Sequence, residues 1–257
     1  MNYALVTGAS SGIGFAYAQA LAQRGYNLIV VSNDALALAT SVETLWQTYS
    51  ALSIIPLEMD LGRAEAAEEL YCWTQQQGYI VDVLINNAGV YHDRDFLDDT
   101  LAFTELILHL HVTTPTLLMH RFASDMVKRG QGYVLNMSSV TSNFAAQRLS
   151  TYSSTKGYLR FLSRATYIEL RQRGVHVTCV RPGAVATGLY NISPRAMRIG
   201  LALGYIITPE KLARKALKAL FAGRQELTPG LSTKLLDWSV RLLPTHLLCL
   251  IRRLHLF

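Results

Sequence analysis

Cysteine is scarce in this chain, with three residues among 257, at Cys72, Cys179 and Cys249. An odd and widely spaced set of cysteines does not make a disulfide framework, and it lacks the spacing of a metal-ligand cluster. We therefore expect no metal site, and we expect thiols that lie buried or idle in a reducing cytosol.

Charged residues and long apolar runs are also limited. Charged residues make up 16% of the chain, and the arginines are scattered, without a basic stripe that carries interleaved aromatics. This argues against a nucleic-acid interface. No uninterrupted apolar run reaches the roughly 20 residues that span a bilayer, and a strand starts too early to leave room for a signal peptide. A cytoplasmic protein is expected, and the net charge of +6 suits an anionic cofactor or membrane surface.

Hydrophobic residues are plentiful, at 50% of the chain, and they fall into short runs separated by helical patterns. Such a composition supplies a large core for one α/β domain. The strand-like runs lie at residues 3–7, 27–31, 53–59, 81–85, 132–137 and 175–180, and the helical patterns lie between them. The alternation predicts a single-domain Rossmann-type fold, which is a doubly wound parallel sheet with helices on both faces.

A glycine-rich turn stands directly between the first strand and the first helix. Its sequence is Gly8-Ala9-Ser10-Ser11-Gly12-Ile13-Gly14. Glycines let a backbone turn tightly and approach a pyrophosphate, and the N-terminus of the following helix then meets the phosphate charge. The turn therefore predicts a dinucleotide site, with a simple tight loop as the alternative.

Tyr152 and Lys156 are four residues apart in the helical pattern over residues 150–173. This spacing places both side chains on one helix face. A free tyrosine titrates near 10, whereas an adjacent ammonium in a desolvated site favours the phenolate. The pair could then exchange a proton with a substrate oxygen held by Ser139. Taken alone, the pair is also compatible with two residues on a solvated helix face.

Five motifs, in the same order and spacing, resemble the short-chain dehydrogenase/reductase family from residue 2 to about 230. They are Thr7-Gly8-x-x-x-Gly12-x-Gly14, Asn86-Asn87-Ala88-Gly89, Ser139 placed 13 residues before the tyrosine, Tyr152-x-x-x-Lys156, and Pro182-Gly183 followed by Thr187. The resemblance implies an NAD(P)-dependent oxidoreductase in which Tyr152 is the general acid or base and Ser139 hydrogen-bonds the substrate oxygen. Lys156 would lower the pKa of the tyrosine and hold the nicotinamide ribose.

The resemblance also implies which residues contact the cofactor. Asn87 could instead be only a turn residue, and Asp60 could cap a helix that starts near Arg63 as well as lie near the adenine ring. The full expected set is Gly8, Ser10, Ser11, Gly12, Ile13, Gly14, Ser32, Asn33, Asp60, Leu61, Asn87, Ala88, Gly89, Tyr152, Lys156, Pro182, Gly183, Val185 and Thr187.

One position departs from the family pattern. The family places an asparagine in the long helix before the fifth strand, where it holds a proton-relay water near the lysine. The matching residue here is His111, with His109 as the alternative. A histidine can bridge a water and can titrate near neutral pH. His111 is therefore a candidate catalytic residue, and the alternative is a hydrogen-bonded structural histidine.

The end of the second strand bears on cofactor choice. NAD-preferring relatives carry an acid there, and this chain has Ser32 followed by Asn33. Neither residue repels a 2′-phosphate, so NADP(H) is expected over NAD(H), by a modest margin because no arginine is present. Asp34 would oppose the phosphate unless it caps the following helix.

Two segments follow the last motif. Residues 188–207 could be a pair of packed helices or an apolar cover over a lipophilic substrate. We assign residues 1–230 to the dinucleotide-binding and catalytic domain and 231–257 to an apolar, basic extension. Its stretch 235–257, which Pro244 would break into two short helical pieces, could lie on a membrane, pack on a sister subunit or close the pocket.

Two classes of function remain. The first is an oxidoreductase that acts on a lipophilic ketone or secondary alcohol, such as a 3-oxoacyl, keto-lipid or steroid-like compound, in a homo-oligomer. The second is a non-catalytic dinucleotide-binding regulator. The chain retains Ser139, Tyr152 and Lys156 together, which favours the enzyme.

Overall fold

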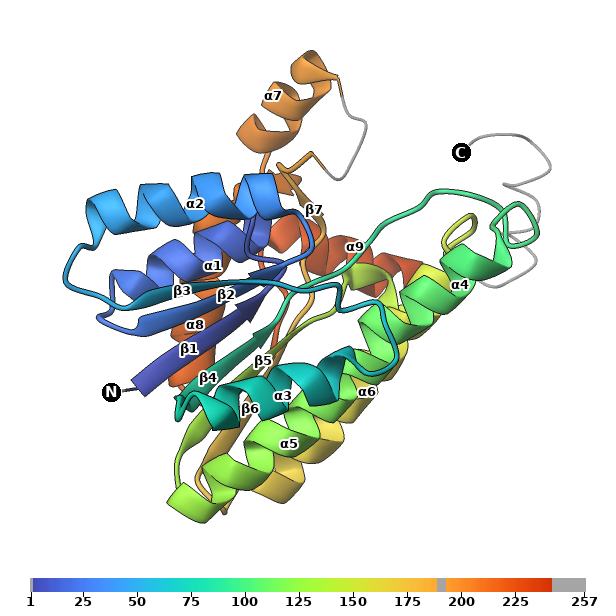
Figure 1. The fold of residues 1–257 in the computed structure, drawn as a ribbon. Coiled ribbons are helices and arrows are strands. Elements are labelled where there is room, and N and C mark those ends of the chain that lie inside the picture. The colour runs from blue at the N-terminus through green and yellow to red at the C-terminus, as the bar shows by residue number, and fades with distance from the viewer. Residues whose placement is uncertain (1, 189–192, 242–257) are drawn as a thin grey trace.

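A seven-stranded parallel sheet forms the centre of the protein (Figure 1). The computed structural model describes residues 2–188 and 193–241. The strands lie in the order β3-β2-β1-β4-β5-β6-β9. Their bounds are β1 Asn2–Thr7, β2 Asn27–Ser32, β3 Ile54–Glu58, β4 Ile80–Asn86, β5 Gly132–Met137, β6 Val175–Val180 and β9 Glu226–Leu227.

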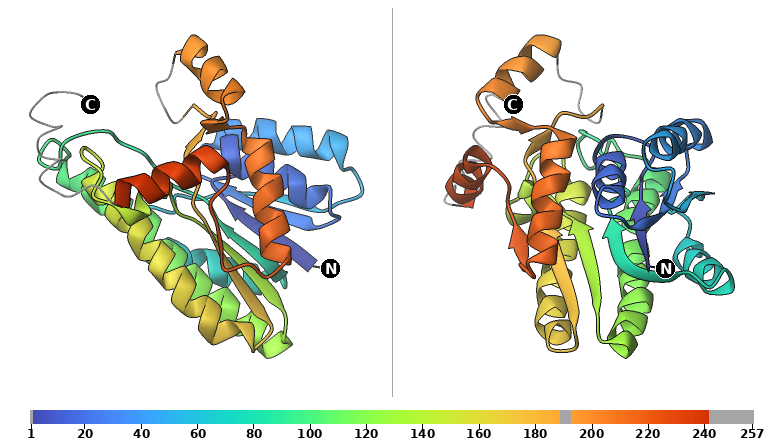
Figure 2. Two further views of the ribbon diagram at one scale, coloured as in Figure 1. Left: turned by 180° about the vertical axis from the view of Figure 1, so that it is seen from behind. Right: turned by 90° about the vertical axis from the view of Figure 1, so that its left-hand side faces the viewer.

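Helices cover both faces of this sheet (Figure 2). One layer packs Tyr17 and Leu217 against β1, and the other packs Leu70 and Phe122 against the opposite face. The first layer consists of α1 Gly12–Ala22, α2 Ala35–Thr48 and α8 Pro209–Phe221, and the second of α3 Ala66–Gln76, α5 Thr114–Arg129 and α6 Ser150–Arg171. The Rossmann-type, doubly wound α/β fold expected from the sequence is confirmed.

The central strands are mostly apolar because both of their faces are buried. In β1, Ala4 and Val6 belong to one core cluster, while Leu5 belongs to the other. Parallel strands covered by helices on both sides show continuous rather than alternating hydrophobicity. The seventh strand was not expected, since β9 has only two residues, Glu226 and Leu227, paired with Cys179 and Val180 of β6. A strand that short carries no periodic signal.

The long helix before the fifth strand contains a change of geometry. It is built from α4 Leu101–Leu108, the π-helical turn η1 His109–Thr113, and α5. A π-turn widens the helix by an extra residue and is frequently found at functional sites. Here the widened turn contains His111, which is 1% exposed.

The same run, Leu101–Arg129, is long and apolar enough to cross a membrane by length and composition, with a mean hydropathy of 1.2 over an 18-residue window. The expectation of no spanning segment rested on uninterrupted apolar runs, and polar residues interrupt this one. In the structure α5 packs Leu118, Phe122 and Met126 into the core. This is the arrangement of a helix that covers a sheet.

The two expected helix caps have different outcomes. Asp34 caps α2 as expected, because its carboxylate accepts a hydrogen bond from Ala37 N at 3.0 Å. The cap expected from Asp60 is wrong, since α3 begins at Ala66. The Asp60 carboxylate instead accepts from Gly62 N at 2.9 Å, within the turn after β3.

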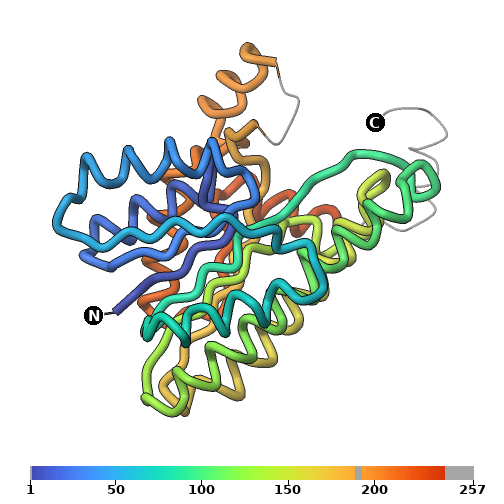
Figure 3. The backbone as a smooth tube through the Cα atoms, viewed as in Figure 1, coloured from blue at the N-terminus to red at the C-terminus, as the bar shows by residue number. Residues whose placement is uncertain are grey.

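The described residues of the segment 184–207, after β6, form a second, two-stranded sheet and one helix. The strands β7 Ala184–Val185 and β8 Ile206–Ile207 pair with each other, and α7 Pro194–Ala202 lies between them in the sequence. Residues 188–207 therefore do not form the pair of packed helices considered above, although residues 189–192 lie outside the described part. The α7 helix has no buried residue and stands away from the sheet (Figure 3).

The C-terminal extension begins with the helix α9 Leu231–Arg241, which packs against the 3-10 turn η2 Val140–Asn143. Of the two helical pieces expected around Pro244, the first overlaps α9 as far as Arg241, whereas the second lies outside the described residues. The α9 helix therefore packs on the turn that Ser139 begins, and it is part of the folded domain.

Candidate active site

The expected site residues meet at the carboxyl ends of the strands. A cleft of about 610 Å³ contains the glycine turn and the residues after β2, β3 and β4, and a pocket of about 70 Å³ lies at its inner end. Ser139, Tyr152, Lys156 and His111 line the inner pocket together with Pro182, Gly183 and Val185. Ligands bind at this edge in open α/β sheets. The cleft lining includes Gly8, Ser10, Ser11, Gly12, Ile13, Gly14, Ser32, Asn33, Asp60, Leu61, Asn87, Ala88, Gly89 and Thr187.

The glycine turn leaves its backbone open toward the cleft. Gly8 has a φ of +65°, a conformation that side chains other than glycine rarely adopt. A Cβ on Gly14 would lie 1.9 Å from the carbonyl oxygen of Gly8, so only glycine fits there. The turn therefore forms a cradle that a dinucleotide pyrophosphate fits at the N-terminus of α1.

Asn87 fixes this turn to the end of β4. Its side-chain amide donates to the carbonyl oxygens of Thr7 and Gly8, at 3.0 and 3.2 Å. The hydroxyl of Thr7 accepts from the backbone amides of Asn87 and Ala88, both at 3.0 Å. Asn87 is thus more than a turn residue, since it holds two strand ends and the glycine turn in one arrangement.

The far end of the cleft is rich in hydroxyl groups. Ser32 Oγ donates to Ser10 Oγ at 2.9 Å, and Asp34 N donates to Ser32 Oγ at 3.2 Å. The Asp34 carboxylate faces the first turn of α2, as its cap contact requires. Among the described residues that line the cleft there is no lysine or arginine.

The first turns of α6 place Lys156 beside Tyr152. Lys156 Nζ lies 5.7 Å from the centre of the Tyr152 ring and donates to Met137 O at 3.0 Å. The lysine side chain is buried, and burial lowers its pKa from 10.5 to about 8. At neutral pH the ammonium form still predominates, so a cation is present next to the tyrosine.

Ser139 follows β5 and begins the turn η2. Its Oγ accepts two hydrogen bonds from Thr141, one from the backbone N–H at 3.2 Å and one from the hydroxyl at 3.0 Å. Its carbonyl oxygen accepts from Ser142 Oγ at 2.6 Å. Sequence reasoning did not identify Thr141 or Ser142 as site residues, because a Ser-Val-Thr-Ser run has the composition of many polar loops.

His111 lies at the pocket, whereas the alternative His109 does not line it. Its Nε2 accepts from Val90 N at 3.0 Å, and its Nδ1 lies 3.1 Å from Thr155 Oγ1. The Thr155 hydroxyl donates to Tyr152 O at 2.8 Å, so the Nδ1–H is the donor to Thr155. Burial, followed by the charge of Lys156, lowers the pKa of His111 well below its usual range. The ring is therefore a neutral imidazole with both nitrogens engaged.

A small cavity of about 10 Å³ lies between His111, Lys156 and Asn86. That volume is about one water. Asn86 Oδ1 is buried beside it without a hydrogen-bond partner, while Nδ2 of the same residue donates to Asn136 Oδ1 at 2.8 Å. The cavity thus combines the size and an unused acceptor that an internal water requires.

Tyr91 is a further residue that sequence reasoning missed. Its ring packs edge-on against the Tyr152 ring, with centres 5.3 Å apart, and His111 packs against Tyr152 at 5.7 Å. These two rings restrict the orientation of the tyrosine side chain. The sequence feature that could have indicated Tyr91 is its place two positions after the Asn-Asn-Ala-Gly motif.

A model of the short chain dehydrogenase family matches residues 2–196 of this chain. The chain therefore belongs to the short-chain dehydrogenase family of oxidoreductases. Among curated relatives, the very-long-chain 3-oxoacyl-CoA reductase-B of Danio rerio is 28% identical over 253 residues, which is 96% of this chain and 78% of that protein. The inactive hydroxysteroid dehydrogenase-like protein 1 of Homo sapiens is 30% identical over 193 residues, covering 73% of this chain and 57% of that protein.

Solved structures agree with this assignment. A short-chain dehydrogenase from Sphingobium yanoikuyae, in complex with NADPH, has a TM-score of 0.79 and 29% identity, over 90% of this chain and 89% of that one. The bulky-bulky ketone specific alcohol dehydrogenase from Comamonas testosteroni has a TM-score of 0.78 and 27% identity, over 89% and 86%.

Proposed function

We propose that this protein is an NADP(H)-dependent oxidoreductase that interconverts a lipophilic ketone and its secondary alcohol. The observation that carries the proposal is the convergence of Ser139, Tyr152 and Lys156 on one pocket at the inner end of the dinucleotide cleft. When bound, the nicotinamide cofactor supplies or accepts the hydride. The glycine turn would hold its pyrophosphate, and Lys156 would hold the nicotinamide ribose.

The protein residues handle the proton and the developing charge. In carbonyl reduction, the Tyr152 hydroxyl donates a proton to the substrate oxygen as negative charge builds there, and in alcohol oxidation it accepts one. Ser139 donates a hydrogen bond to the same oxygen, which stabilises that charge in the transition state. The ammonium of Lys156 stabilises the phenolate that Tyr152 becomes after proton donation.

In this scheme His111 holds the neighbouring segments in position, and its ring does not carry a proton during the reaction. Both ring nitrogens are already hydrogen-bonded, which supports this assignment over the direct relay considered from the sequence. The imidazole ties the loop at Val90 to the helix that carries Tyr152. We place a relay water in the small cavity beside Lys156, where Asn86 Oδ1 supplies an acceptor.

The cofactor preference follows from the hydroxyl-rich end of the cleft. The hydroxyl of Ser10, which accepts from Ser32, and the amide of Asn33 can donate hydrogen bonds to a 2′-phosphate. The carboxylate of Asp34 faces away, toward α2. The absence of arginine from the described lining limits the preference to about tenfold, or about 1.4 kcal/mol. The NADPH complex of the Sphingobium relative supports the same choice.

The substrate class is proposed from the relatives and from the apolar surroundings. The Danio relative is named for a 3-oxoacyl-CoA substrate, and the Comamonas relative is named for bulky ketones. Val90, Val185 and Tyr91 lie around the pocket, and apolar side chains suit the groups that flank such a carbonyl. A 3-oxoacyl, keto-lipid or steroid-like ketone meets these requirements.

The test is an assay of NADPH oxidation with a panel of such ketones. We expect turnover with at least one bulky ketone, and Tyr152→Phe should reduce kcat by about 100-fold or more because the transferable proton is gone. Turnover that survives Tyr152→Phe would contradict the mechanism. An NADPH-binding chain that is inert toward every ketone would instead support the non-catalytic class, to which the name of the human relative points.

The quaternary and membrane contacts are also proposals. Phe161 and Ile168 of α6 are 63% and 71% exposed, which supports a homo-oligomer built through that helix face. Trp238 of α9 is 65% exposed, which supports contact of the stretch 235–257 with a membrane surface from the cytoplasmic side. Light scattering and co-sedimentation with anionic vesicles test these two proposals separately.

A further inference from the structure

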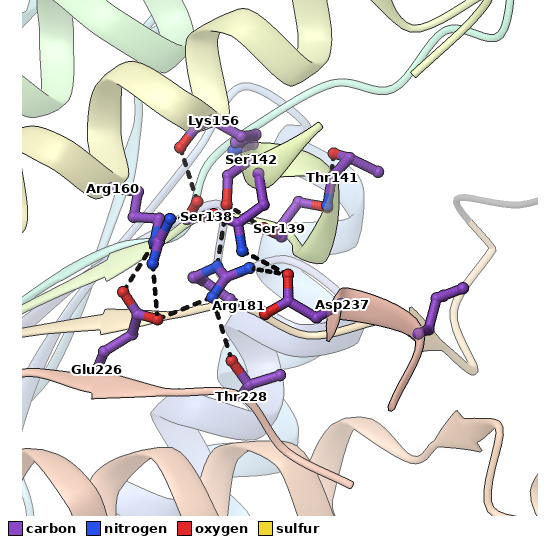
Figure 4. A network of polar contacts seen from close by, with 12 residues as sticks. Ser138, Ser139, Thr141, Ser142, Lys156, Arg160, Arg181, Glu226, Thr228 and Asp237 are labelled. Carbon is purple, nitrogen blue, oxygen red and sulfur yellow. Dashed lines mark hydrogen bonds and ion pairs between the residues drawn. The ribbon is translucent and has the colours of Figure 1, made fainter. Parts of the chain in front are cut away.

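A network of polar contacts surrounds Arg181 near Ser139 (Figure 4), and five of its residues form a closed ring. Arg181, directly after β6, donates to Glu226 Oε1 at 2.8 Å and to Asp237 Oδ1 at 2.6 Å. Asp237 also accepts from the side-chain amide of Asn143, and Asn143 Oδ1 accepts from Arg160. Arg160 Nε completes the ring by donating to Glu226 Oε2 at 2.8 Å. The ring joins β9, α6, η2 and α9 to the end of β6.

The charges in this ring are buried and depend on one another. Arg181 is 1% exposed, Arg160 is 8% exposed and Asp237 is 9% exposed. Although burial alone would raise the pKa of Glu226, hydrogen bonds from Arg160 and Arg181 lower it overall. Removing one partner from a buried ion pair leaves an uncompensated charge, which costs several kcal/mol unless the segment moves toward water.

One contact connects the ring to the catalytic serine. Arg181 Nε donates to Ser142 Oγ at 3.0 Å, and Ser142 Oγ donates to Ser139 O at 2.6 Å. The backbone N–H of Val140 donates to Pro182 O at 2.9 Å, which holds the same turn to the segment after Arg181. The position of the Ser139 backbone is therefore coupled to the position of the Arg181 guanidinium.

Asp237 brings the C-terminal extension into this arrangement. It is the single acid among residues 231–257. The α9 helix buries the polar residues Thr233 and Asp237, whereas Leu235 and Trp238 are exposed. This is the reverse of an ordinary amphipathic helix. Hydrogen bonds, and not an apolar face, therefore attach α9 to the body of the protein.

We propose that Asp237 is a positioning residue for Ser139, acting through Arg181 and Ser142. By holding the guanidinium in place, it keeps the backbone of the serine where the hydroxyl meets the substrate oxygen. The inference rests on the proposed oxidoreductase function, and it makes α9 a part of the catalytic apparatus.

The test is a double-mutant cycle between Asp237→Asn and Ser139→Ala. The asparagine keeps the shape and removes the charge. Alone, it should lower kcat by about 10- to 100-fold, the effect of displacing a reacting group by about 1 Å, with little change in the Kd of NADPH. In the Ser139→Ala chain, adding Asp237→Asn should lower kcat little further, because the hydroxyl that Asp237 positions is already gone. If the fold losses in kcat of the two single variants multiply in the double variant, the proposal is overturned.

Lys234→Ala is the matched control, since Lys234 is exposed on the same helix, and it should leave kcat unchanged. If Asp237→Asn does not fold, Ser142→Ala replaces it in the cycle, because it breaks the link to Ser139 and leaves the ring charges paired.

Should the wild-type chain oxidise no NADPH, the proposed function fails. Hydrogen exchange then decides this inference separately. Asp237→Asn must speed amide exchange over residues 139–143, Lys234→Ala must not, and unchanged exchange in Asp237→Asn overturns it.

Discussion

Thr141 donates two hydrogen bonds to a single atom, the Oγ of Ser139. A hydroxyl oxygen has two acceptor positions, and these two contacts occupy both. The hydroxyl hydrogen of Ser139 is then the group left to face the pocket. Thr141 therefore sets the serine as a donor, which is the role that a developing negative charge on a substrate oxygen requires.

We expect Thr141→Val to lower kcat by about tenfold, because the serine hydroxyl loses one of the contacts that orient it, a cost of about 1.4 kcal/mol. Thr141→Ser keeps the hydroxyl and should remain close to wild type. Steady-state NADPH oxidation with one bulky ketone measures both variants. Equal kcat for valine and serine at this position would show that the side-chain contact has no part in orienting Ser139.

Affinity for NADPH should weaken as the pH rises. The pKa of Lys156 is lowered to about 8, so its ammonium is present below that pH and is lost above it. Because a cation near the nicotinamide ribose favours the anionic cofactor, the Kd should increase by up to about tenfold per pH unit above about 8. Fluorescence titrations across that range measure it.

Lys156→Met is the control for this pH dependence. The variant should bind NADPH weakly at every pH, and the rise in Kd near pH 8 should disappear. If the wild-type and methionine chains show the same pH profile, another group is responsible for the dependence.

His111 should contribute no step near pH 6.5 to the pH profile of kcat, because its pKa is held well below the usual range. His111→Ala should lower kcat by about tenfold and also lower the melting temperature, since Val90 N and Thr155 lose their partner. His111→Asn introduces the residue type usual in this family and should retain more activity. Full activity of the alanine variant would leave the histidine without a role in the site.

The Kd of NADPH should be about tenfold lower than that of NADH under matched salt. Asn33→Arg should widen this ratio, because a guanidinium gives charge-assisted hydrogen bonds to the 2′-phosphate. Asn33→Gln is the matched control, which lengthens the side chain without charge. Tighter binding of NADH, or an unchanged ratio in the arginine variant, would contradict the expected cofactor preference.

Local patterns in the sequence were sufficient for the fold and for much of the site. Short apolar runs predicted six of the strands, because burial on both faces makes such strands continuously hydrophobic. The helical spacing of Tyr152 and Lys156, and the glycines at positions 8, 12 and 14, express geometry within a few residues. All residues expected to catalyse the reaction or contact the cofactor line the cleft or its inner pocket.

The tertiary structure decided what depends on contacts between distant segments. The ring nitrogens of His111 are occupied because a π-turn brings them to Val90 and Thr155. Asp60 does not cap a helix because the chain turns again before α3 begins. Asp237 reaches Arg181, 56 positions earlier in the chain, because β6 and α9 meet beside η2. Periodicity within a segment carries no information about such partners, since packing between elements alone determines which polar groups are buried together.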